Sequence, residues 1–152
     1  LFRDITTLLK DAHAFRQVID LIADEHQEKG IDQVIGIESR GFIFASALAL
    51  RLGAGLILVR KPGRLPAATR SQSYALEYGL DSLEIHVDAL RKENRVLVVD
   101  DLLATGGTAA AAVALARGSG AAVVGCAFAI ELEDLAGRGR LDGIPVFSLI
   151  KY

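Results

Sequence analysis

The residues best suited to chemistry lie in one run, from position 96 to position 108. Its first four residues (Val-Leu-Val-Val) predict a buried parallel strand, because they are apolar and mostly β-branched. Asp100 and Asp101 follow directly, so we expect both carboxylates at the carboxyl end of that strand. Ligands of open α/β sheets bind at this end. The two carboxylates can accept hydrogen bonds from ribose hydroxyls or help to hold a hydrated Mg²⁺.

A loop of small and hydroxylated residues comes next, and the alanine-rich run 108–117 predicts a helix after it. Backbone N–H groups at a helix N-terminus, the helix dipole and threonine hydroxyls can together hold a phosphate monoester. The predicted phosphate-binding residues are Ala104, Thr105, Gly106, Gly107 and Thr108. The run lacks the lysine of a nucleotide-triphosphate P-loop and the G-x-G-x-x-G of dinucleotide folds. The alternative interpretation is a tight strand-to-helix turn with solvated carboxylates.

The run 96–108 closely resembles the ribose-phosphate signature of the phosphoribosyltransferases that use phosphoribosyl pyrophosphate (PRPP). Further segments occur in the order found in the adenine-specific members of that family, and the resemblance extends over essentially the whole chain. These segments are 2–6 (FRDIT), 38–42 (ESRGF), 60–66 (RKPGRLP) and 74–79 (YALEYG), with the spelling LLA at 102–104. One motif indicates only the superfamily, whereas five in order indicate the adenine-specific branch.

The resemblance implies transfer of the 5-phosphoribosyl group from PRPP to adenine, giving AMP and pyrophosphate in purine salvage. It makes Glu77 the general acid/base near the purine, and Arg40 is expected to act on the departing pyrophosphate. Asp100 and Asp101 are expected to bind the ribose hydroxyls. Pyrophosphate binding is assigned to Ser39, Arg40, Arg60, Lys61 and Tyr78, and adenine binding to Phe2, Arg3 and Leu132.

Mg²⁺ is the cofactor that this chemistry requires. No spacing of histidine, cysteine or carboxylate residues predicts a metal site built by the protein alone. We therefore expect Mg²⁺ to arrive mainly with PRPP, with Asp100 and Asp101 as its candidate protein ligands.

Composition is consistent with one globular domain, residues 1–152. Hydrophobic residues make up 51% of the chain and charged residues 24%. A net charge of −2 argues against a general nucleic-acid-binding surface, and no apolar stretch is long enough to span a membrane. We therefore expect a cytoplasmic protein without nucleic-acid or membrane partners. The chain begins at Leu1 and contains no methionine, so native N-terminal residues are expected to be missing.

Strands and helices are predicted to alternate along the chain. Helices are expected from Asp11, as N-cap, to about Gly30, at 42–52 and at 108–117. Strands are expected at 34–37, 56–59, 83–87, 96–99, within 121–130 and at 146–150. This order predicts an α/β fold with a mostly parallel central sheet flanked by helices, which the resemblance names the type I phosphoribosyltransferase fold. The long excursion 61–81 is predicted to form a mobile lid. The resemblance implies that the antiparallel excursion 61–88 forms the flexible hood of the family.

Two alternative functions stay open. The first is transfer to another purine base such as hypoxanthine, guanine or xanthine, because base specificity depends on hydrogen bonds within the pocket. The second is a PRPP-responsive regulatory protein, which would be expected to carry a nucleic-acid-binding module or a strongly basic face. The resemblance also implies a homodimer with residues 60–64 near the neighbouring subunit.

Overall fold

A five-stranded parallel sheet forms the centre of the computed structural model, which describes residues 4–152. The strand order is β2-β1-β5-β6-β7, and every neighbouring pair runs parallel. The strands are β1 (Gln33–Ile37), β2 (Gly55–Val59), β5 (Arg95–Leu103), β6 (Ala122–Glu131) and β7 (Val146–Lys151). The predicted α/β class and parallel sheet are confirmed.

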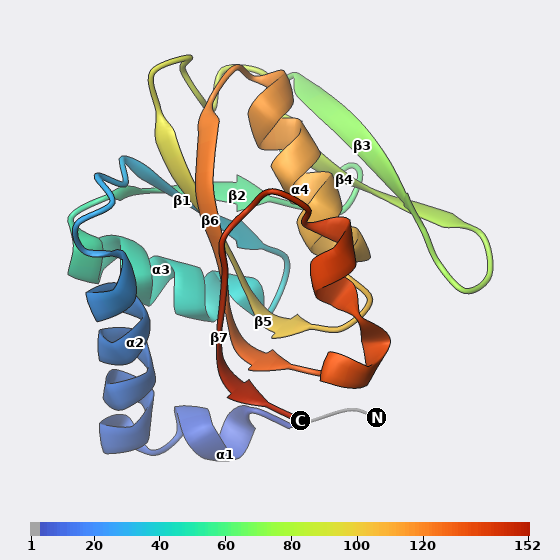
Figure 1. Ribbon diagram of the computed structural model, residues 1–152. Helices are drawn as coiled ribbons and strands as arrows, with labels where there is room; N and C mark the ends of the chain where they lie inside the picture. Colours follow the sequence, from blue (N-terminus) through green and yellow to red (C-terminus); the bar gives the residue numbers. More distant parts are fainter. Residues whose placement is uncertain (1–3) are drawn as a thin grey trace.

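Helices cover both faces of this sheet (Figure 1). One face packs against α2 (Ala12–His26) and α3 (Gly41–Leu52), with the short α1 (Thr6–Leu9) beside them. The other face packs against α4 (Gly107–Gly118). Two short 3₁₀ helices, η1 (Glu133–Leu135) and η2 (Gly137–Arg140), connect β6 to β7. Within residues 4–152, no helix is both long and apolar enough to span a membrane.

Strand β5 divides the apolar side chains between two cores because successive side chains point to opposite faces. Val96 and Val98 pack into the core beneath α4, whereas Leu97 and Val99 pack into the core beneath α2 and α3. All four side chains are fully buried. Full burial of one such side chain stabilises the fold by about 1.5–3 kcal/mol, so this strand is anchored from both sides.

Helix α2 begins at the predicted N-cap. The carboxylate of Asp11 accepts hydrogen bonds from the backbone N–H groups of His13 and Ala14, both at 3.1 Å. The prediction that Gly30 ends this helix is wrong, since the helix ends at His26. Gly30, with a φ of 64°, instead lies in the turn that leads into β1.

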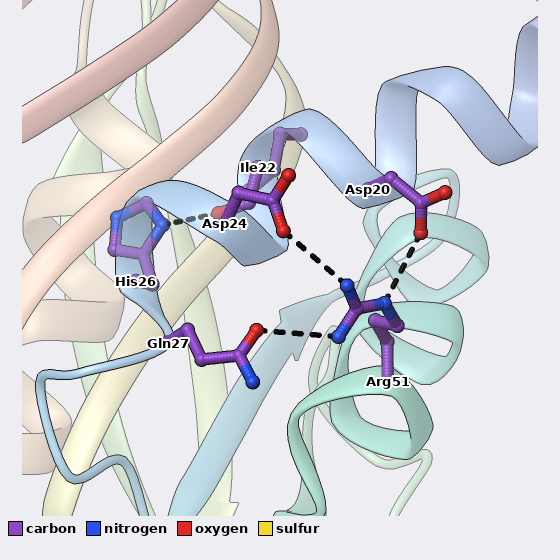
Figure 2. A network of polar contacts seen from close by, with 6 residues as sticks. All are labelled: Asp20, Ile22, Asp24, His26, Gln27 and Arg51. Atoms are coloured by element: carbon purple, nitrogen blue, oxygen red, sulfur yellow. Dashed lines mark hydrogen bonds and ion pairs between the residues drawn. The ribbon is translucent and has the colours of Figure 1, made fainter.

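Arg51 of α3 connects that helix to α2 through hydrogen bonds to three side chains (Figure 2). Its guanidinium donates to Asp20 at 3.1 Å and to both Asp24 and Gln27 at 3.3 Å. These residues follow one face of α2 at spacings of four and three, so one side chain bridges nearly two helical turns. Arg51 therefore helps to fix the orientation of α3.

The excursion 61–88 is largely an antiparallel hairpin, formed by β3 (Thr69–Ala75) and β4 (Leu80–His86). The predicted alternation is confirmed at Leu83 and Ile85, which are fully buried beneath α4 while their strand neighbours are partly exposed. The expected loop is therefore mainly strand, with its turn at residues 76–79. The turn end projects away from the body of the protein (Figure 1).

Strand β5 is longer than its apolar run predicts. It continues through Asp100 and Asp101 to Leu103, so the two carboxylates lie within the strand rather than after it. The extension arises because β6 continues alongside, pairing Asp100 with Phe128 and Leu103 with Glu131. Polar side chains are accepted there because the strand has reached the carboxyl edge of the sheet.

Candidate active site

A cavity of about 740 Å³ opens at the carboxyl ends of β1 and β5. The turn after β1, the end of β5, the N-terminus of α4 and the β3–β4 hairpin surround it. Its lining residues are Glu38, Ser39, Arg40, Lys61, Tyr74, Ala75, Leu76, Glu77, Asp81, Asp100, Asp101, Leu102, Leu103, Ala104, Thr105, Gly106, Gly107, Thr108, Ala109 and Arg140. This volume is typical of a cleft for a small-molecule ligand.

The predicted phosphate-binding residues form the turn into α4. Gly106 is the N-cap with a φ of 87°, a left-handed conformation that favours glycine, and no side chain caps the helix. A Cβ on Gly106 would also lie 2.5 Å from the carbonyl oxygen of Gly137 in η2. The first residues of this uncapped helix, Gly107, Thr108 and Ala109, line the cavity, as an anion site at a helix N-terminus requires.

Asp100 and Asp101 meet the turn after β1 at the floor of the cavity. Asp101 accepts a hydrogen bond from Arg40 Nε at 2.6 Å, and its backbone N–H donates to Asp100 Oδ1 at 2.9 Å. Burial and the neighbouring Asp101 carboxylate raise the pKa of Asp100 well above its ordinary value. Gly41 permits this approach, since a Cβ there would lie 2.8 Å from Asp100 Oδ1.

The hairpin contributes an ion pair to the opposite wall. Lys61 Nζ donates to Tyr74 Oη at 2.6 Å and to Asp81 Oδ2 at 2.7 Å. Burial lowers the pKa of Lys61, but the hydrogen bonds to Asp81 and Tyr74 outweigh burial and raise that pKa above its ordinary value. The pair ties β3 and β4 to the end of β2.

Residues 4–150 match the family model described as the phosphoribosyl transferase domain. The chain belongs to the phosphoribosyltransferase family. Adenine phosphoribosyltransferase of Geotalea uraniireducens is 54% identical over 152 residues, which are 100% of this chain and 89% of the relative. The enzyme of that name from Nostoc punctiforme is 57% identical over 154 residues, covering 100% of this chain and 90% of the relative.

Solved structures agree with this membership. A crystal structure of adenine phosphoribosyltransferase from Thermoanaerobacter pseudethanolicus has a TM-score of 0.97 at 50% identity, covering 99% of this chain and 88% of the other. The Saccharomyces cerevisiae enzyme, solved with an imino-altritol bisphosphate and adenine, has a TM-score of 0.91 at 39% identity. The match covers 97% of this chain and 86% of the yeast chain. The predicted type I phosphoribosyltransferase fold is confirmed.

Most residues predicted for the site of this phosphoribosyltransferase line one cavity. Arg60 and Tyr78, which were predicted to bind pyrophosphate, lie outside its lining. Arg60 donates to Glu38 at 3.0 Å, and Tyr78 is 87% exposed in the hairpin turn. Although burial raises the pKa of Glu38, its hydrogen bonds from Arg60 and from the Lys61 backbone N–H hold that pKa below its ordinary value.

Leu132, the predicted adenine-binding residue within the described part of the chain, does not line the cavity. Leu132 packs with the core beneath α2 and α3, and its backbone N–H donates to the carbonyl oxygen of Leu103 at 2.9 Å. Phe2 and Arg3 lie outside the described residues. Four lining residues with polar side chains were not predicted for the site: Glu38, Tyr74, Asp81 and Arg140. A long separation from the phosphate-binding run left Arg140 without a local signal.

Proposed function

We propose that this phosphoribosyltransferase transfers the 5-phosphoribosyl group from PRPP to adenine, giving AMP and pyrophosphate in purine salvage. The observation that carries the proposal is the joint opening of the phosphate-binding turn and the Asp100–Asp101 pair into the cavity that Arg40 and Glu77 line. Relatives that are more than half identical over the whole chain are named for adenine.

The phosphate-binding turn and the aspartates hold the sugar. The 5′-phosphate accepts hydrogen bonds from the N–H groups of 104–108 and from the two threonine hydroxyls. Asp101 accepts a hydrogen bond from one ribose hydroxyl, and the neighbouring Asp100 carboxyl, whose pKa burial and Asp101 raise, is placed beside it to contact the other. With both ends of the ribose fixed, its C1 atom is held for attack by the purine nitrogen.

The leaving pyrophosphate lies towards the turn after β1. Ser39 and Arg40 present a hydroxyl and a guanidinium there, and Lys61 adds an ammonium from the facing wall. Negative charge develops on the pyrophosphate as its bond to C1 of the ribose breaks. These donors therefore stabilise the transition state more than the ground state. Arg40 is oriented for this work by its 2.6 Å bond to Asp101.

Glu77 is the proposed general acid/base. It lies at the start of the hairpin turn, on the cavity side, with an exposed carboxylate. A turn that folds over bound substrates would remove water from Glu77 and bring it to the purine, where it moves a proton at a ring nitrogen.

The donor set of the cavity fits Mg²⁺ bound together with PRPP. Five lining carboxylates (Glu38, Glu77, Asp81, Asp100 and Asp101) face only three cations (Arg40, Lys61 and Arg140). A polyanionic substrate requires a further cation there, and Mg²⁺ is commonly held by one or two carboxylates plus phosphates. Within residues 4–152, no group of three histidine, cysteine, aspartate or glutamate side chains could hold a metal ion. The proposed protein contacts of Mg²⁺ are therefore the two neighbouring carboxyl groups of Asp100 and Asp101. Bound Mg²⁺ would neutralise phosphate charge and help the leaving group depart.

We also propose a homodimer. Strand β2 lies at the edge of the sheet, and its Leu56 and Leu58 side chains are each 38% exposed. Apolar side chains beside a free sheet edge are suited to burial against a second copy. Sedimentation velocity of the purified protein checks this proposal.

The decisive experiment incubates the protein with PRPP, Mg²⁺ and each purine base separately, and follows nucleotide formation. AMP from adenine alone is the expected result. IMP, GMP or XMP as the main product would show that the substrate is another purine base and not adenine. PRPP binding by calorimetry without any product would instead favour the regulatory protein.

A further inference from the structure

The 3₁₀ helix η2 touches the phosphate-binding turn although about 30 residues separate them in the chain. The contact is backbone to backbone: a Cβ on Gly106 would collide with the Gly137 carbonyl oxygen, and one on Gly137 would collide with the Ala104 carbonyl oxygen. In Figure 1 the deep-orange ribbon of this segment lies beside the lower end of α4. Two glycines thus let η2 form part of the wall of the phosphate site.

Arg140, the last residue of η2, extends over the first turn of α4. Its Nη1 atom lies 3.7 Å from the position of a Cβ on Gly107, and its side chain lines the cavity. The two other cations of the lining are already engaged, because Arg40 pairs with Asp101 and Lys61 with Asp81. No ion pair or hydrogen bond of the Arg140 side chain occurs among residues 4–152.

A clamp fixes η2 in this position. Arg138 donates to both carboxylate oxygens of the buried Glu131, with Nε at 2.9–3.0 Å and Nη2 at 2.8 Å. Its Nη1 donates to the carbonyl oxygen of Val146 at 3.1 Å. One arginine of η2 therefore anchors the segment to β6 and β7, while the other stays available to a ligand.

We propose that Arg140 binds the 5′-phosphate of PRPP and AMP, completing from η2 a site that α4 begins. The turn itself offers only N–H groups and hydroxyls, so a phosphate dianion there lacks a cationic partner until Arg140 joins it. A guanidinium can form two parallel hydrogen bonds with a phosphate and brings a full positive charge, which a helix N-terminus alone does not provide. This inference rests on the proposed function, since it assigns a binding residue for the same substrate.

The test is the affinity of Arg140→Gln for ribose 5-phosphate, measured by calorimetry without turnover. Loss of the charged contact is expected to weaken binding about tenfold. In steady-state assays the KM for PRPP should rise by a similar factor and kcat should fall by less than that factor, because the 5′-phosphate is remote from the reacting bond. Arg140→Lys should recover part of the affinity, since it keeps the charge but loses the paired geometry.

Arg91→Gln is the matched control. Arg91 is exposed in the turn before β5, at the opposite end of the sheet, and the variant loses the same charge. Binding by Arg140→Gln within twofold of wild type, or an equal loss in Arg91→Gln, would overturn the inference. Because ribose 5-phosphate binding needs no turnover, that outcome is separate from absence of AMP formation by the wild type, which would overturn the proposed function. Unchanged circular dichroism and Tm verify folding of each variant.

Discussion

Glu77 is exposed in the hairpin turn, so its role in proton transfer depends on the substrate-bound state. We predict that Glu77→Gln lowers kcat by about 10²–10⁴-fold, the usual contribution of a general acid/base, while PRPP affinity changes little. Stopped-assay kinetics and calorimetry with PRPP measure the two effects. The neighbouring Leu76→Ala is the control for disturbance of the turn. Unchanged turnover in Glu77→Gln would remove this carboxylate from the mechanism.

The two aspartates of β5 are predicted to differ in importance. Asp101→Asn removes the charge that holds Arg40 as well as a ribose contact, so we expect PRPP to bind about tenfold more weakly or worse. Asp100→Asn should have the smaller effect, because burial already favours the neutral form of that side chain. Calorimetry with PRPP and Mg²⁺ compares the variants. Equal losses would contradict the different environments assigned to the two residues.

Single residues were predictable where a local motif carried them. The phosphate-binding turn and both aspartates lie at the cavity, since strand, acids, glycines and helix follow one another in the chain. Arg60 was assigned from its charge at the end of a predicted strand and Tyr78 from its place in the lid, and the structure places both outside the lining. Arg140 was missed because a 3₁₀ helix that is distant in sequence supplies it. The sequence around Arg140 carries no motif that predicts its position beside the phosphate-binding turn.

The Glu131–Arg138 clamp is predicted to stabilise η2 in a pH-dependent manner. Arg138 holds the pKa of Glu131 below its ordinary value, so the stabilisation is complete above the ordinary glutamate pKa and is lost as pH falls through the lowered pKa. Glu131→Gln should lower the free energy of unfolding by about 1–3 kcal/mol near neutral pH, a value reduced because the Arg138 side chain is 42% exposed.

Urea unfolding at several pH values measures this effect. The difference between Glu131→Gln and wild type should shrink as the solution becomes acidic. The exposed Glu133→Gln is the control, because it makes the same chemical change beside the clamp. A difference that stays constant with pH would show that the ionised pair does not contribute.

Secondary structure was predictable where one face of an element is buried. The periodicity of α2 and the apolar runs of the parallel strands identified those elements, although β5 extends four residues beyond its apolar run. That extension depends on pairing with β6, which is a tertiary contact. Strand β3 was not distinguished from loop because most of its residues are polar and exposed. Its pairing with β4 supplies the hydrogen bonds that its composition does not signal.

The arrangement of the entire fold places all the charged groups of the site at one end of the sheet. Two apolar cores support β5 from either face, and the cavity opens where that support ends. Five carboxylates and three cations line the cavity, so its field repels an uncompensated polyanion. Binding of a polyanionic substrate therefore depends on a cation that neutralises its charge, and a substrate bound in this way stabilises the folded protein.

PRPP with Mg²⁺ is predicted to raise the Tm by about 5–10 °C at a hundred times its Kd, from about 2.7 kcal/mol of linkage and the usual dependence of Tm on stability. Chelation of Mg²⁺ by EDTA should remove most of this shift, because metal-free PRPP brings its full negative charge against the lining carboxylates. Ribose 5-phosphate is the control ligand: it lacks the pyrophosphate, so its smaller shift should survive EDTA. An undiminished PRPP shift in EDTA would mean that the protein's own cations suffice, contrary to the charge balance of the cavity.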